Sequence, residues 1–179
     1  MLVAWTSDLS TGIDVIDDQH QRIMDYINQL GGIGRSKYSG LGSQIKLTDK
    51  IDDNIDSILD EAIFQDRLSV GLVLNALVDY TVSHFAFEES LQVEAGYTFA
   101  KPHKAVHDIF IKRVTRYQEM HNAGEDVAED LHSMLSIWLI NHIKKDDMAY
   151  VKEVKANILD IVSDKEKKKD NNWIKRFFS

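Results

Sequence analysis

Apolar residues recur at intervals of three and four along most of the chain, which is the spacing of one face of an α-helix. The first such face extends from about residue 12 to residue 30 and includes Ile16, Ile23 and Ile27. The glycine-rich stretch GGIGRSKYSGLGS follows it, and because glycine favours turns over helices, this stretch predicts a loop. A helical period returns over residues 46–65, where we expect an additional helix.

Three more amphipathic faces follow along the chain. One extends from about Ser69 to Gly96, and the next begins at Pro102, a residue suited to the first turn of a helix, and ends at HNAGED. The last extends from about Glu125 to Val162 and is expected to be the longest helix. Four long helices bury their apolar faces most simply side by side. We therefore predict an all-α fold, an antiparallel up-down four-helix bundle with an additional helix inserted between its first two helices.

The composition excludes several classes of protein. The chain has 179 residues with 44% hydrophobic and 28% charged residues, as in soluble globular proteins, and its net charge of -8 argues against nucleic-acid binding. It contains no cysteine, which excludes disulfides, iron-sulfur clusters and thiolate zinc sites. The N-terminus lacks the features of a signal peptide, and no apolar run approaches about 20 residues. These features predict a cytoplasmic protein without an integral membrane segment.

Residues that commonly bind metals lie on the inward faces of the expected helices. His84 and Glu88 are four residues apart, and so are His103 and His107. Residues at this spacing lie one helical turn apart on the same face. Each pair therefore presents two side chains to one site. The first helix adds His20 on its apolar face.

The motif HIKKDD brings a further histidine, His142, with two aspartates. Asp146 lies nearer to His142 on the helical wheel than Asp147 does, so spacing alone favours Asp146. Each group by itself has an ordinary explanation, because a buried histidine is commonly a hydrogen-bonded packing residue and His/Glu pairs are common on solvated helix faces. All four inward faces, however, carry such residues, although polar groups are normally excluded from them.

The donor set suggests the kind of metal site. Imidazoles with few carboxylates suit iron, zinc, copper or nickel better than magnesium or calcium. Seven donors are too many for one tetrahedral ion but suit two ions that share bridging carboxylates. The Glu-x-x-His pairs of carboxylate-rich di-iron bundles are absent. The residues therefore predict a histidine-rich site for two metal ions, and they leave the metal open.

Four segments, WTSDLSTGIDVIDDQH, HFAFEE, KPHKAVH and HIKKDD, resemble the successive signatures of the bacteriohemerythrins and are spread over most of residues 5–150. This resemblance implies a bacterial oxygen carrier, not an enzyme, that binds dioxygen at two iron ions (Fe2+/Fe3+) with an oxo or hydroxo bridge. It also implies the ligands: His103, His107 and His142 on one iron, His20 and His84 on the other, and Glu88 and Asp147 as bridges. The resemblance, and not the helical spacing, selects Asp147 over Asp146.

The resemblance further implies that dioxygen binds at the iron with two histidines, in a dry pocket. Phe85, Trp138, Leu139 and Tyr150 lie beside the expected ligands and are candidates for its walls, although each suits an ordinary bundle core equally well. Two other functions stay open: a di-iron enzyme acting on nitric oxide or peroxide, and an oxygen or iron sensor. A bundle with zinc or without metal is the plainest alternative.

Two segments depart from the family pattern. We expect a hemerythrin-like domain over residues 1–162, in which residues 31–61 are an insertion in the first connection. A long surface insertion costs little loop entropy, and it is also a candidate regulatory element. Residues 163–179 form a basic and aromatic tail, which is a candidate for contact with a protein or a membrane surface, or a solvated terminus. His121 and His132 match no signature position, and we expect them to be surface or packing residues.

Overall fold

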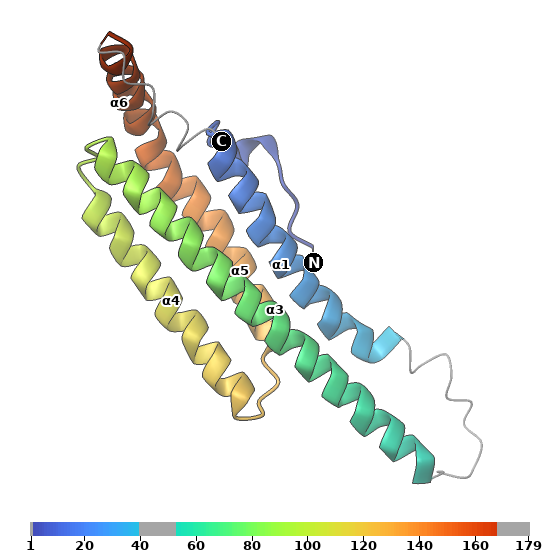
Figure 1. The fold of residues 1–179 in the computed structure, drawn as a ribbon. Coiled ribbons are helices and arrows are strands. Elements are labelled where there is room, and N and C mark those ends of the chain that lie inside the picture. Colours follow the sequence, from blue (N-terminus) through green and yellow to red (C-terminus); the bar gives the residue numbers. More distant parts are fainter. Residues whose placement is uncertain (1, 40–52, 168–179) are drawn as a thin grey trace.

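The computed structural model describes residues 2–39 and 53–167, and within these ranges every regular element is helical (Figure 1). The side chains described lie within residues 2–33 and 61–157. The elements in chain order are a short 3-10 turn η1 (Ser7–Leu9), α1 (Asp14–Ser39), α3 (Asp53–Glu94), α4 (Ala100–Asn122), α5 (Ala128–His142), a π-helical turn η2 (Ile143–Asp147) and α6 (Met148–Lys167).

The helices form an antiparallel four-helix bundle, which confirms the predicted fold class. Neighbouring helices run in opposite directions, and α5, η2 and α6 together make the fourth helix (Figure 1). Helix α1 packs along α3 and α5, while α3 packs along α4. The inward faces of all four helices therefore line the central axis of the bundle.

The connection between the first two helices differs from the prediction. Helix α1 does not end near residue 30 but continues through the glycines to Ser39. Residues 53–65, expected in a separate helix, are the beginning of α3, which is the longest element described; residues 46–52 of that expected helix lie outside the described residues. Of the expected insertion, residues 31–39 and 53–61 therefore lengthen two bundle helices. Residues 168–179 of the expected tail also lie outside the described residues.

Gly31 shows why α1 passes through its glycines. A Cβ atom at this position would lie 2.6 Å from Nε2 of His132, which is a distance that no real Cβ contact tolerates. His132 is buried on α5, so α1 and α5 approach closely here. The glycine therefore serves packing between helices and does not end the helix. Tertiary contact outweighs the weak helix propensity of glycine.

Asp17 fixes the start of α1. Its carboxylate accepts hydrogen bonds from the Thr11 backbone N–H at 2.8 Å, the Thr11 hydroxyl at 2.7 Å and the Ser10 hydroxyl at 2.6 Å. Burial alone would raise the pKa of Asp17, but these hydrogen bonds lower it. Gly12 adopts a φ of 67°, in the left-handed region, and allows the chain to turn around the carboxylate. The first helix is thereby anchored one turn before His20.

Two apolar clusters fill the bundle, one on each side of the level at which the expected ligands lie. The larger cluster contains Ile27, Leu77 and Leu135, and the smaller one contains Ile16, Leu91 and Val154. In α1 the sequence passes from Ile16 of the smaller cluster through His20 to Ile23 of the larger one, and α3 likewise carries Leu77 of the larger cluster before Glu88 and Leu91 of the smaller one after it. The polar residues are therefore enclosed by apolar side chains above and below.

Part of α3, Glu61–Glu94, is long and apolar enough to cross a membrane, judged by length and composition alone. In the bundle, this stretch turns Leu74, Leu77 and Leu91 into the core and carries the buried polar residues His84 and Glu88. Of its most apolar 18-residue window, 33% is buried in the bundle, while Phe64, Leu68 and Leu72 on the same stretch are exposed.

Candidate metal centre

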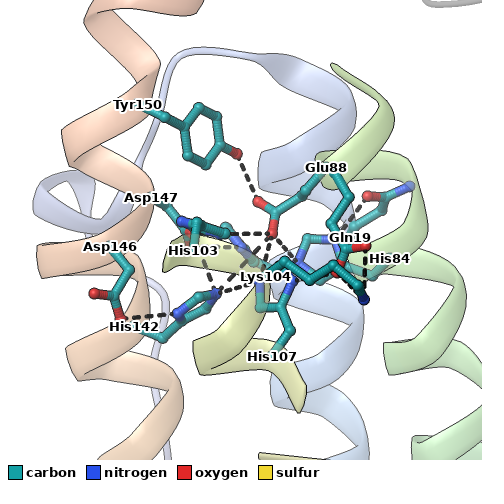
Figure 2. A network of polar contacts seen from close by, with 12 residues as sticks. Gln19, His84, Glu88, His103, Lys104, His107, His142, Asp146, Asp147 and Tyr150 are labelled. Carbon is teal, nitrogen blue, oxygen red and sulfur yellow. Dashed lines mark hydrogen bonds and ion pairs between the residues drawn. The ribbon is translucent and has the colours of Figure 1, made fainter. Parts of the chain in front are cut away.

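The seven residues expected as metal ligands converge in the middle of the bundle, and Figure 2 shows six of them labelled. Every one is buried, with an exposed fraction of 5% or less. They come from all four helices: His20 from α1, His84 and Glu88 from α3, His103 and His107 from α4, His142 from the end of α5, and Asp147 from η2.

Three histidines surround one end of the Glu88 carboxylate. Glu88 Oε2 lies 3.4 Å from Nε2 of His107, 3.8 Å from Nε2 of His103 and 4.0 Å from Nε2 of His142. The two rings of His107 and His142 approach each other to 3.1 Å between their Nε2 atoms. Glu88 with these three histidines forms a group whose ligand atoms all lie within 4.8 Å of one another.

A second group consists of His20, His84 and the same Glu88. Glu88 Oε2 lies 3.7 Å from Nε2 of His84. Asp147 links the two groups, because its Oδ2 lies 3.3 Å from Nε2 of His20 while its Oδ1 lies 3.2 Å from Nε2 of His142. The two carboxylates therefore stand between a group of three imidazoles and a group of two.

The donor atoms suit cations and lack other partners. His84 Nε2, His103 Nε2, Glu88 Oε2, both oxygens of Asp147 and both ring nitrogens of His20 find no hydrogen-bond partner within the described residues. Burial of unpaired polar atoms costs free energy, and metal ions in their midst would remove that cost. Nitrogen and oxygen donors in this ratio fit a pair of transition-metal ions.

Burial also sets the protonation of the imidazoles. It lowers the pKa of His20 and His107, and it lowers the pKa of His84 to about 3. These rings are therefore neutral at neutral pH and keep a lone pair for a metal ion. Burial and the adjacent Glu88 charge raise the pKa of Asp147. Two carboxylates placed this close in a buried site favour a bound cation.

The π-helical turn η2 gives the two aspartates different positions. It widens the backbone between His142 and Asp147, so that the side chain five residues after the histidine faces the cluster and is fully buried. Asp146 lies outside, with 37% of its side chain exposed, and its Oδ2 is 3.0 Å from Nδ1 of His142. The preference of regular helical spacing for Asp146 is wrong, because the helix is not regular here.

Sequence reasoning missed the outer partners of the histidines. Gln19 Oε1 accepts a hydrogen bond from Nδ1 of His84 at 2.8 Å (Figure 2). Glu89 Oε1 accepts one from Nδ1 of His107 at 3.1 Å. Asp146 does the same for His142. Each partner directly precedes or follows an expected ligand in the sequence. That adjacency is the signal that could have identified them.

Aromatic residues enclose the cluster. The ring of Phe85 stacks on His107 with 3.7 Å between ring centroids, and Trp138 stacks on His142 at 4.4 Å. Leu139 and Tyr150 are buried beside them. The Tyr150 hydroxyl also donates a hydrogen bond of 2.6 Å to Glu88 Oε1 (Figure 2), which the sequence did not indicate.

The two remaining described histidines lie away from this cluster. His132 is buried against Gly31, and the ring of His121 lies against Gly71, where a Cβ atom would be 3.0 Å from its Nε2. Both are packing residues, as expected from their positions outside the motifs.

Comparisons with known proteins agree with this geometry. The family model described as Hemerythrin HHE cation binding domain matches residues 11–154. A bacteriohemerythrin of Stenotrophomonas maltophilia is 40% identical over 181 residues, which cover 99% of this chain and 98% of the relative. A bacteriohemerythrin of Pseudomonas aeruginosa is 38% identical over 180 residues, which cover 98% of this chain and 97% of the relative.

More distant relatives show the same relationship. The bacteriohemerythrin of Methylococcus capsulatus is 31% identical over 151 residues, covering 83% of this chain and 94% of the relative. A solved wild-type hemerythrin structure matches with a TM-score of 0.65 and 28% identity, covering 86% of this chain and 98% of that chain. With its fold, its buried histidine and carboxylate cluster and these relatives, the chain belongs to the hemerythrin family.

Proposed function

We propose that this protein binds dioxygen reversibly at a pair of iron ions and acts as an oxygen carrier or store, not as an enzyme. The observation that carries the proposal is the set of seven buried donors from all four helices, in which histidines outnumber carboxylates. Its relatives over nearly the full chain are bacteriohemerythrins.

In this proposal, the group of three imidazoles holds one iron and the group of two holds the other. His103, His107 and His142 are the terminal ligands of the first ion, and His20 and His84 are those of the second. Glu88 and Asp147, which stand between the two groups of imidazoles, would be shared by both ions. The distances from Asp147 to His20 and His142 support its bridging role. The second position would have one imidazole fewer than the first and would be the one to take a small ligand such as dioxygen.

A pair of ferrous ions, when bound, supplies the two electrons that dioxygen takes up and gives back. The residues of the chain keep that exchange reversible by excluding water and stray protons. Phe85 and Trp138 cover two of the imidazoles with their rings. Burial and the Glu88 charge raise the pKa of Tyr150 well above its usual value. Its hydroxyl therefore keeps its proton and orients Glu88.

We further propose that residues 1–162 form the oxygen-binding domain, in the cytoplasm, and that residues 163–179 are an appendage. The relative from Stenotrophomonas maltophilia aligns over 99% of this chain, so the additional length is a feature of that relative as well.

The test is a variant comparison on iron-loaded, anaerobically reduced protein, in which visible absorption is recorded before and after oxygen is admitted. The wild type and His121→Ala, which removes a histidine outside the centre, should develop the same oxygen-dependent band. His84→Ala should lose it, because the second iron then has one imidazole. An unchanged band in His84→Ala contradicts the assigned site. Sustained oxygen, nitric oxide or peroxide consumption with a reductant would instead indicate an enzyme.

A further inference from the structure

The hydrogen bonds on the outer side of the imidazoles divide the centre into two unlike halves. In the group of three histidines, His107 and His142 each donate from Nδ1 to a carboxylate, Glu89 at 3.1 Å and Asp146 at 3.0 Å. In the group of two, His84 donates to the neutral amide oxygen of Gln19 at 2.8 Å. His20 has no hydrogen-bond partner for either ring nitrogen within the described residues.

A carboxylate behind an imidazole makes the opposite nitrogen a better metal donor. The negative charge stabilises positive charge on the ring when a cation binds, and it also fixes the ring orientation. An amide oxygen fixes the orientation but carries no net charge. Outer partners of this kind change metal affinity by about 10-fold to 100-fold. Two carboxylates support the first group, and no carboxylate supports the second through a hydrogen bond that the structure describes.

The surroundings of the two carboxylates preserve this difference. The side chains of Glu89 and Asp146 are 22% and 37% exposed, so water screens part of their charge, but each contacts its imidazole directly. The Lys104 ammonium lies 3.1 Å from the carboxylate of Glu89 and also 3.1 Å from that of Asp108, so it forms ion pairs with both. Lys104 is itself half exposed, so it holds Glu89 in place without neutralising the hydrogen bond to His107.

We propose that Glu89, Asp146 and Gln19 are positioning residues that set the order in which the two metal positions fill. The position of His103, His107 and His142 fills first and empties last, and the position of His20 and His84 is the exchangeable one. The inference rests on the proposed two-iron site and adds to it a defined one-metal state. The different number of imidazoles acts in the same direction, but variants of the outer partners leave that number unchanged and so isolate their effect.

The experiment supplies the full chain with one ferrous ion per chain without oxygen and counts chains with zero, one and two irons by native mass spectrometry. Two equal and independent positions leave about half of the chains with one iron, whereas a 100-fold difference in affinity raises that share to about four fifths. We expect the wild type to be near the higher value.

Three variants test the roles of the partners. Glu89→Gln and Asp146→Asn weaken the tighter position, and Gln19→Glu strengthens the weaker one, so each should lower the one-iron share, to about two thirds for a 10-fold change. If the filling order were the reverse, all three would raise that share. The matched controls are Glu94→Gln on α3 and Gln21→Glu on α1, which make the same chemical changes at exposed positions and should leave the distribution at the wild-type value.

The outcomes separate this inference from the proposed function. A one-iron share that is the same in the three variants and the two controls overturns the inference, as does a share that rises. Gln19→Glu introduces a carboxylate and leaves Glu89 and Asp146 in place. Its one-iron share therefore tests the inference even if Glu89→Gln or Asp146→Asn fails to fold. A chain that takes up two irons in the expected order but binds no dioxygen contradicts only the oxygen-binding function. A chain that takes up no iron contradicts both.

Discussion

The contact between Gly31 and His132 predicts that alanine substitutions at two neighbouring glycines differ in their effect on stability. Alanine at position 31 would place its Cβ 2.6 Å from Nε2 and 2.7 Å from Cδ2 of His132, whereas a Cβ at Gly32 meets nothing within 4 Å. Both positions lie inside α1, so both substitutions gain about 1 kcal/mol of helix propensity. Only Gly31→Ala has to displace a buried ring.

The difference between the two variants therefore isolates the packing cost. Overpacking a buried site costs about 1–3 kcal/mol, so Gly31→Ala should have a free energy of unfolding about 1–3 kcal/mol lower than that of Gly32→Ala. Gly32→Ala should be more stable than the wild type by up to about 1 kcal/mol. For a chain of this size, each kcal/mol corresponds to about 2–4 °C in Tm.

The assay is urea unfolding followed by circular dichroism, with the metal content held equal in all variants because bound metal stabilises the folded state. A His132→Ala background supplies the control, since removing the ring should make Gly31→Ala stabilising. Equal stability of Gly31→Ala and Gly32→Ala in the wild-type background would refute the close approach of α1 and α5.

Three further predictions concern the anchor of α1 and the buried centre. Asp17→Ala should lower the free energy of unfolding by about 2–4 kcal/mol, because it removes the acceptor of several hydrogen bonds. Those bonds lower the pKa of Asp17 in the folded state. Their contribution to stability is therefore fully present above the aspartate pKa of the unfolded chain and is lost as the pH falls through the folded pKa. The difference in unfolding free energy between the wild type and Asp17→Ala should accordingly shrink in urea titrations at acid pH. Tyr150→Phe should lower the free energy of unfolding by about 1–3 kcal/mol, because Glu88 Oε1 loses its buried hydrogen-bond donor. A variant as stable as the wild type contradicts the donor role of Tyr150. His84 alone should cost the metal-free protein about 1.4 kcal/mol of stability for each pH unit below about 6.5. The reason is that the pKa of His84 is about 3 in the folded state, so only the unfolded state takes up a proton in this range. A stability that is constant from pH 7 to 5 contradicts the burial of His84 as a neutral ring.

The sequence was most informative where polar residues interrupt an apolar face. His20, His84 and His107 lie on faces that should be apolar, so their positions predicted both the helices and the centre to which they point. The apolar periods also predicted the four helices of the bundle. These signals are local along one helix, and they need no knowledge of the neighbouring helices.

The remainder depended on contacts between distant segments. Gly31 predicted a helix end, but the ring of His132 on another helix requires a glycine inside α1. The inward position of Asp147 depends on the π-helical turn, which the ordinary period of 3.6 residues does not represent. Likewise, Glu89 lies next to an expected ligand, but its contact with His107 arises only when α3 and α4 pack together.

The most direct measurement of the central claim is an oxygen titration of the iron-loaded, reduced protein followed by degassing. We expect about one dioxygen to bind for each pair of iron ions and a visible band to appear in proportion. Removal of oxygen should return both the gas and the original spectrum over repeated cycles. Oxygen that is consumed without being released, or a protein whose spectrum does not respond to oxygen, would contradict reversible oxygen binding at this centre.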